Sequence, residues 1–183
     1  AIFTESIALA AVVGDRVLYA DLVNNLGAIM NMRGMAERAL ELYAESLEIY
    51  DAQNEIRKAA YTRNNIAITF LERGQLDGAF NHFKAAGEVA LQIKDASLAL
   101  IVNINLADLC LRRGALADAK LHCLAAERHL VENGLRNGHL VEIKKIAGKI
   151  AVGESDIIAA TNIFNEALAI SREVGAKYQE AEI

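Results

Sequence analysis

The residues best suited to recognition chemistry are asparagines that recur along the chain at one interval. Asn25, Asn65 and Asn105 follow one another every 40 residues, and Asn24 and Asn64 precede the first two. A side-chain amide has two N–H donors and a carbonyl acceptor, so a row of amides can bind a peptide main chain without reading its sequence. Asparagine is mildly unfavourable inside a helix, because its amide competes for backbone hydrogen bonds. The recurrence therefore requires a reason.

The same interval of 40 also separates residues that belong to the framework of the chain. Three sets recur at it: Arg33-Gly34, Arg73-Gly74 and Arg113-Gly114; Ala39, Ala79 and Ala119; and Tyr43, Phe83 and Cys123. Residues such as Ala39 and Tyr43, one helical turn apart, lie on the same face of a helix. Glycine can end a helix in the left-handed conformation. A period of this length is typical of repeat arrays, and each unit is predicted to be two helices joined at the glycine.

The pattern sets the bounds of the expected helices. They are residues 16–33 and 36–52, 56–73 and 76–93, 96–113 and 116–132, and 137–152 and 156–174. In the fourth unit Ile146 and Ala160 are 14 residues apart, whereas the earlier units have 13. We therefore expect an extra residue in the turn at 153–156, with a helix N-cap at Ser155 or Asp156.

These motifs resemble the tetratricopeptide repeat (TPR), in which Leu-Gly and an aromatic residue precede Ala-x-x-x-Phe in the second helix. The matching residues are Leu26-Gly27 with Met30, Ile66-Ala67 with Phe70, Leu106-Ala107 with Cys110, Ile146-Ala147 with Ile150, and the pairs that run from Ala39–Tyr43 to Ala160–Phe164. The chain lacks the Trp and Pro of that pattern, and its unit exceeds the usual 34 or so residues. It is similar in this to kinesin light chains, spindle-orientation adaptors and bacterial TPR regulators. The resemblance implies an all-α fold, a right-handed superhelical array of antiparallel helix pairs (a TPR-like α-solenoid).

The repeats divide the chain into one array. We expect a second helix of an incomplete repeat at 1–14, repeats at 15–54, 55–94, 95–134 and 135–175, and the start of a further helix at 176–183. The first residues align with a second helix, because Phe3-Thr4-Glu5-Ser6-Ile7 matches Tyr43-Ala44-Glu45-Ser46-Leu47 at the same interval. Neither end resembles a capping repeat, and we expect a fragment of a longer protein.

Two interpretations of the recurring amides stay open. Each amide could hydrogen-bond a neighbouring helix, or the amides could line the concave groove formed by the first helices. The resemblance favours the second, because similar long-repeat proteins place an Asn of this motif in the ligand groove. Helical spacing adds residues on the same face. The predicted peptide-binding groove contains Asn24, Asn25, Asn64, Asn65, Asn105, Ile68, Asp108, Arg112, Lys144 and Lys145.

The last two of these residues predict a basic end of the groove. Counted at the interval of 40, Lys144-Lys145 takes the place of the Asn-Asn pair in the fourth unit. Such a site could receive an acidic side chain or a terminal carboxylate. A solvated run of charge is the equal alternative.

Other reactive residue types have simpler interpretations. Cys110 and Cys123 occupy repeat core positions and are expected to pack as small apolar residues in a reducing compartment. Metal binding by Cys123 with His122 is the weaker alternative, because no C-x-x-C pair or third ligand accompanies them. His82 and His122 recur at the interval and are expected on the helix surface. The sequence has no phosphate-binding loop or nucleophile elbow, so we expect neither catalysis nor a cofactor.

Composition limits the class of partner. A net charge of −5 argues against nucleic-acid or anionic-membrane binding, which requires clustered basic residues. No apolar run reaches the roughly 18 residues of a membrane span, and we expect a cytoplasmic protein. The expected function is protein–protein interaction, as a sensor, regulatory or adaptor part of a signalling protein. The alternatives are an oligomerisation module that pairs through apolar residues such as Ile7 and Leu9, or the TPR region of a bacterial transcription activator with its output domain elsewhere.

Overall fold

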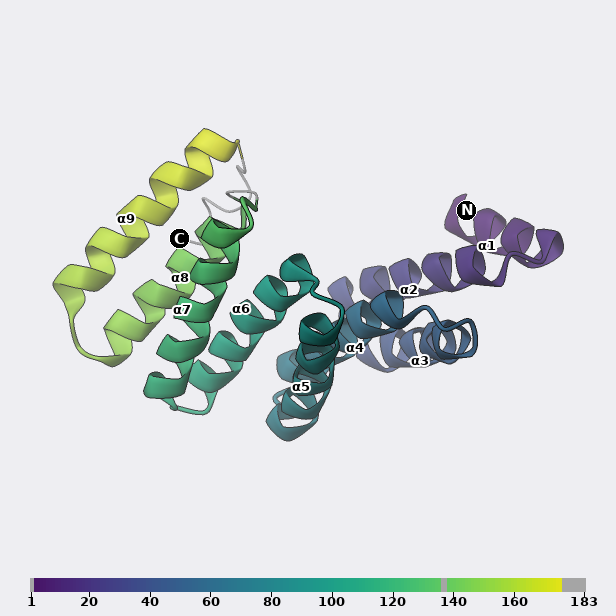
Figure 1. Ribbon diagram of the computed structural model, residues 1–183, viewed down its shortest axis with the longest axis horizontal. Helices are drawn as coiled ribbons and strands as arrows, with labels where there is room; N and C mark the ends of the chain where they lie inside the picture. The colour runs from purple at the N-terminus through teal and green to yellow at the C-terminus, as the bar shows by residue number, and fades with distance from the viewer. Residues whose placement is uncertain (1, 136–137, 176–183) are drawn as a thin grey trace. The chain divides into compact units, whose positions relative to one another are not determined.

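The computed structural model describes residues 2–135 and 138–175 (Figure 1). Its helices are α1 (Ile2–Val13), α2 (Arg16–Met32), α3 (Ala36–Ala52), α4 (Ile56–Glu72), α5 (Leu76–Gln92), α6 (Ala96–Arg112), α7 (Leu116–Glu132), α8 (Gly138–Gly153) and α9 (Ile157–Val174). From α2 onward, their bounds agree with the predicted ones to within one residue. The helix predicted to begin at 176–183 lies outside the described residues.

The chain consists of two compact units, Ala1–Ile93 and Lys94–Ile183. In the first unit α2 packs on α3 and α4 packs on α5, while α3 also contacts α4 (Figure 1). In the second unit the same pairing joins α6 to α7 and α8 to α9, and α8 contacts both α6 and α7. All regular structure in the described residues is helical. The fold is an all-α helical repeat, as predicted.

Left-handed residues end the helices and allow the tight turns. Gly34, Gly74 and Gly114 have φ of +75°, +72° and +74° after α2, α4 and α6, a conformation that costs glycine little. The turn after Met32 is closed by a bond of 2.9 Å from the Met35 N–H to the Met30 carbonyl. The three predicted glycine turns are therefore confirmed.

The fourth repeat differs from its prediction. Three residues, 154–156, separate α8 from α9, the same number as between α2 and α3, so this turn has no extra residue. The predicted insertion at 153–156 is therefore wrong. The predicted N-cap is confirmed at Asp156, whose carboxylate accepts a bond of 2.9 Å from the Ala159 N–H.

Contacts between helices fix this register independently. A Cβ on Gly27 would lie 2.7 Å from Tyr43 Cε1, and a Cβ on Gly148 would lie 2.5 Å from Phe164 Cε1. Each aromatic ring thus lies directly against a glycine 16 residues earlier in the chain. Gly148 is therefore the structural counterpart of Gly27, one residue later than an interval of 40 predicts.

Candidate peptide-binding face

Polar side chains join α2 to α4 in the first unit. Asn24 Oδ1 accepts hydrogen bonds from Thr62 Oγ1 at 3.1 Å and from Asn65 Nδ2 at 3.5 Å. Two turns further along α2, Asn31 Nδ2 donates to Glu72 Oε2 at 2.7 Å. Residues seven apart lie on one face of a helix, so these bonds form a row, which we call the α2–α4 ladder. The ladder holds the two first helices of this unit side by side.

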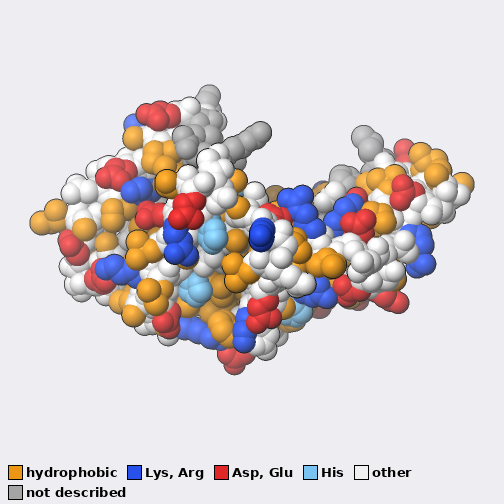
Figure 2. Space-filling view, viewed as in Figure 1, with side chains coloured by type: hydrophobic (Ala, Val, Ile, Leu, Met, Phe, Trp, Pro, Cys, Tyr) orange, Lys and Arg blue, Asp and Glu red, His pale blue; other side chains and the backbone are white. Residues whose placement is uncertain are grey.

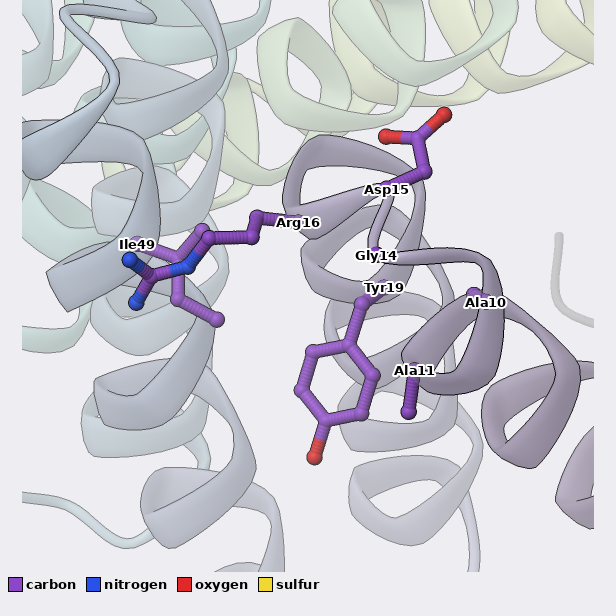
Figure 3. A pocket seen from close by; sticks show the side chains of 7 residues that line it. All are labelled: Ala10, Ala11, Gly14, Asp15, Arg16, Tyr19 and Ile49. Carbon is purple, nitrogen blue, oxygen red and sulfur yellow. The ribbon is translucent and has the colours of Figure 1, made fainter.

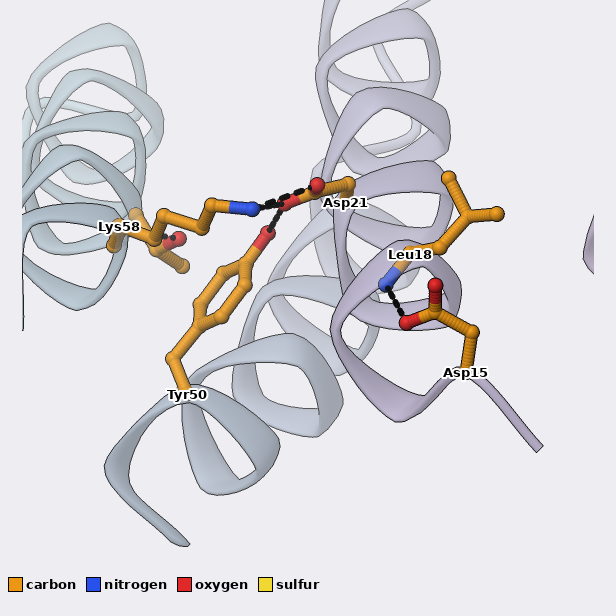
Figure 4. A network of polar contacts seen from close by, with 6 residues as sticks. Asp15, Leu18, Asp21, Tyr50 and Lys58 are labelled. Carbon is orange, nitrogen blue, oxygen red and sulfur yellow. Dashed lines mark hydrogen bonds and ion pairs between the residues drawn. The ribbon is translucent and has the colours of Figure 1, made fainter. Parts of the chain in front are cut away.

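The ladder continues toward the start of α2 through Asp21 (Figure 4). Asp21 Oδ1 accepts from the Tyr50 hydroxyl at 2.7 Å, and Lys58 Nζ lies 2.9 and 2.7 Å from the two carboxylate oxygens. Burial and, next, the bond to Asp21 raise the pKa of Tyr50 well above its usual value. Tyr50 is only 2% exposed, and its phenol remains a neutral donor at any physiological pH. The network ties α3 to both first helices.

A cavity of about 250 Å³ opens at this network. It is lined by Asp21, Asn24, Tyr50, Arg57, Lys58 and Tyr61. The Arg57 guanidinium lies 5.5 Å from the centre of the Tyr61 ring, and Lys58 Nζ lies 5.9 Å from that of Tyr50. The cavity therefore offers cations, a carboxylate, an amide and two aromatic rings within one small volume. Such a mixture suits the polar main chain and one side chain of a peptide.

The predicted amides of the first unit have different surroundings. Asn25 is exposed, Asn64 is buried, and Asn24 and Asn65 are half-buried. Asn24 and Asn65 contact each other, as the interpretation of helix-to-helix bonding expects. Ile68 is half-buried on α4. The structure thus brings Asn24 to the cavity and places Asn25 at the surface, while Asn64 lies within the helix packing.

In the second unit, Asp108 connects α6 to α8. Its carboxylate accepts from Arg112 Nε at 2.9 Å within α6 and lies 3.6 Å from Lys149 Nζ on α8. Asn105 is half-buried one turn before Asp108 on the same helix. Three of the predicted residues, Asn105, Asp108 and Arg112, therefore belong to one stretch of α6 that faces α8 through the Asp108 ion pair.

The predicted basic pair is placed differently from the expectation. In the structural register, Lys145 corresponds to Asn24 and the buried Ile146 corresponds to Asn25. The prediction that Lys144-Lys145 replaces the Asn-Asn pair is therefore wrong by one residue. Lys144 Nζ contacts Glu166 at 3.0 Å, and Lys145 Nζ, in a side chain only 12% exposed, contacts Glu142 at 3.5 Å. Both lysines thus form ion pairs within the second unit.

A second cavity in the first unit, of about 220 Å³, lies between α1, α2 and α3 (Figure 3). Ala10, Ala11, Ile49 and the Tyr19 ring supply most of its wall. The Tyr19 hydroxyl donates to Glu45 at 2.5 Å, and this bond raises the pKa of Tyr19. Asp15 and Arg16 also line the cavity, which contains none of the predicted groove residues.

The histidines lie deeper than the sequence indicated. His82 is half-buried and stacks on Phe70, with ring centres 5.5 Å apart. His122 is also half-buried, and its Nδ1 lies 2.9 Å from Asn103 Oδ1. Burial lowers the pKa of both imidazoles. The expectation of surface positions is therefore corrected: each histidine packs against the first helix of its own repeat.

The cysteines are buried, as their repeat positions predicted. Cys123 Sγ lies 3.7 Å from the Ile143 carbonyl oxygen, and burial raises the pKa of its thiol to about 11. Burial also raises the pKa of Cys110. Among the described residues, no three His, Cys, Asp or Glu side chains are grouped so that they could hold a metal ion.

The Asp21 network was not recognised in the sequence as a unit. Tyr50 on α3 and Lys58 on α4 both contact Asp21 on α2. Their separations along the chain, 29 and 37 residues, differ from the repeat interval. Periodicity therefore carried no signal for this contact.

Comparison with known proteins supports the fold. The crystal structure of BtubC (BKLC) from P. vanneervenii is similar to this chain, with a TM-score of 0.71 and 18% sequence identity. The match covers 87% of this chain and 66% of that one. No protein-family model and no curated protein matches the sequence. The structural likeness shows a TPR-like helical-repeat fold. Within the described residues, no helix has the length and apolar character needed to cross a membrane.

Proposed function

We propose that this chain is a protein-interaction module that binds a segment of another protein along the face of its first helices. The cavity of about 250 Å³ between α2 and α4 supports this proposal most directly, since it contains Asn24 beside paired cations and aromatic rings. Helical-repeat proteins bind partners over such extended faces. Fold alone does not determine function, so the proposal depends on the chemistry of this cavity.

Exposed groups on α2 suggest how a segment binds beside the cavity. The amide of Asn25 can donate to and accept from a peptide main chain, and it is exposed. Met32, 87% exposed on the same helix, offers an adaptable apolar contact. Main-chain bonds would supply affinity with little sequence preference, and the Arg57–Tyr61 pair would select the side chain that enters the cavity.

In the second unit, the proposed ligand contact is an acidic group near Lys144 and Lys145. Both lysines already contact glutamates of this unit, so an acidic ligand would exchange with Glu166 or Glu142 rather than fill an unpaired site. We further propose that the module belongs to the long-repeat TPR branch and serves a cytoplasmic adaptor or regulatory protein. Its role is binding without catalysis, and its partner is a protein rather than nucleic acid or a membrane.

Site-specific photo-crosslinking tests the proposal. A benzoylphenylalanine replaces Asn25 or Met32 on α2, and the matched control replaces Asn162, which is exposed on the second helix α9. Crosslinks to the same partner segment are expected at Asn25 and Met32 and not at Asn162. Asn25→Ala should then lower the affinity for the purified partner segment about fivefold, which corresponds to about 1 kcal/mol for the loss of one hydrogen bond. Equal crosslinking at Asn162 would contradict binding along the first helices.

A second candidate function, self-association, is favoured by α1. Leu9, Val12 and Val13 are among its large exposed apolar residues, with Val12 84% exposed, and apolar side chains gather over the α1 end in the space-filling view (Figure 2). Exposed apolar patches often mark interfaces. Sedimentation equilibrium of the chain and of Val12→Glu would test it, since only an interface at α1 makes the variant more monomeric than the parent.

A further inference from the structure

A third cavity, of about 200 Å³, lies among α7, α8 and α9 in the second unit. Ala147 and Ala151 of α8 line it, two residues before and after Lys149. Each residue of an α-helix turns by 100°, so these two alanines lie about 160° around α8 from Lys149. Lys149 contacts Asp108 on α6. The cavity therefore opens on the side of α8 away from α6, where the second helices α7 and α9 lie. We call it the α7–α9 pocket.

Comparison of the two units explains why this pocket exists. The helices α3, α4 and α5 are the counterparts of α7, α8 and α9, with one residue of shift at α8. In that register Cys123 stands where the first unit has Tyr43, and Ala151 stands where it has Phe70. Tyr43 is buried with Ala39 and Ile66, and Phe70 packs against this cluster. Aromatic rings thus fill in the first unit the space that small residues leave open in the second.

The volume and lining of the pocket suit one aromatic ring. An apolar cavity of about 150 Å³ is known to bind benzene, and this pocket is somewhat larger. Besides the two alanines, Ile150, Ile163 and Cys123 contribute to its wall. A ring bound there would regain the contacts that Tyr43 and Phe70 make in the first unit.

The rim of the pocket carries charge of mainly one sign. Lys120 Nζ contacts Glu154 Oε1 at 3.1 Å, and Glu127 and Asp156 add two further carboxylates. One cation therefore faces three anions. Leu124, 55% exposed, continues the apolar wall out to the surface. A ligand that carries cations on both sides of its ring would complement this rim.

We propose that the α7–α9 pocket binds an aromatic side chain of a partner protein, in a segment where basic residues flank the aromatic one. The site is separate from the first-helix face, and it does not depend on the function proposed for that face. The aromatic ring replaces the missing rings of the repeat, and the flanking cations contact Glu127 and Glu154. The first unit cannot bind such a ring at the equivalent place, because its own Tyr43 and Phe70 occupy it.

Nuclear magnetic resonance titration of the whole chain with short capped peptides tests the proposal. The probes are acetyl-Lys-Phe-Lys-amide, the same peptide with Ala or with flanking Glu, and p-cresol. We expect saturable shifts of the Ala147, Ala151 and Ile163 methyl groups with Lys-Phe-Lys, and intermolecular contacts from its ring to those methyls. The Glu-flanked peptide should bind about threefold to tenfold more weakly, as expected for two exposed charge pairs. The Ala peptide should not bind.

A variant that fills the pocket is the second arm. Ala151→Phe places a ring where the first unit has Phe70, beside Ala159 in the place of Gly78, and should abolish the shifts. Ala52→Phe, at an exposed position of α3, should not change them. If Ala151→Phe does not fold, the intermolecular contacts in the parent chain decide the matter. Contacts to methyls outside the pocket, or equal binding of the Ala peptide, would overturn the proposal. It would also be overturned if p-cresol bound as tightly as Lys-Phe-Lys, which would indicate a small-molecule cavity.

Discussion

Replacing Tyr50 by phenylalanine removes one hydroxyl from the Asp21 network and leaves the aromatic ring in place. The hydroxyl lies 2.7 Å from Asp21 Oδ1, and hydrogen bonds to charged groups contribute about 1.5–3 kcal/mol to stability. The Asp21 side chain is 36% exposed and keeps its contact with Lys58, so water can replace part of the lost bond. We therefore expect the free energy of unfolding to fall by about 1 kcal/mol.

A double-mutant cycle measured by urea unfolding isolates this bond. In an Asp21→Ala background the acceptor is absent, so Tyr50→Phe should change the free energy of unfolding by only a few tenths of a kcal/mol. Lys58→Met is the comparison, with an expected cost of at most about 1 kcal/mol for a part-exposed ion pair. Repeat arrays can unfold unit by unit, so the transition that includes the first unit is the relevant one. An equal cost of Tyr50→Phe in both backgrounds would refute the reasoning.

Three further outcomes follow from the packing. Gly27→Ala should be destabilising by about 1 kcal/mol. Overpacking against the buried Tyr43 ring costs about 1–3 kcal/mol, whereas the gain in helix propensity is only about 1 kcal/mol. Thermal unfolding would measure the loss, and a stabilised variant would contradict the close contact. Burial lowers the pKa of His122. As the pH drops below about 6.5, the unfolded chain therefore binds a proton before the folded chain does, and the stability falls. His122→Gln should flatten this pH dependence of the free energy of unfolding, and an unchanged slope would refute the role of His122. Burial raises the pKa of Cys123 to about 11. At pH 8 its thiol should therefore react with iodoacetamide about a hundredfold more slowly in the folded chain than in the urea-unfolded chain. Equal rates measured by mass spectrometry would contradict its burial.

Helix bounds were predictable because local chemistry sets them in each repeat. A glycine with positive φ ends the first helix at Gly34, Gly74 and Gly114, and the sequence alone shows those glycines. Other turns use residues that mark this conformation less clearly than glycine: Lys94 and Ser155 have positive φ, and so does Asn54, a residue type that adopts it more readily. The repeat pattern, and not each turn residue, predicts the fold.

The candidate site was less predictable, because an amide's role depends on its neighbours in space. Asn25, Asn64 and Asn65 belong to the same repeated motif, yet the first is exposed, the second is buried and the third contacts Asn24. Periodicity places these residues on equivalent turns of equivalent helices. It does not say which helix lies opposite each side chain, and that decides whether an amide is available to a ligand.

The register of the fourth repeat shows how one residue alters a functional inference. Cys123 is the counterpart of Phe83 whether or not the fourth repeat is shifted by one residue, because it lies before the shift. The counterpart of Phe70 in α8 does change with the shift. Counted by that interval, the counterpart of Phe70 two repeats later is Ile150, which is itself a large apolar residue. The glycine contacts shift the register so that Ala151 takes the place of the ring. The α7–α9 pocket is therefore invisible to periodicity, since the bounds of α8 and the packing of Gly148 against Phe164 identify which residue takes the place of Phe70.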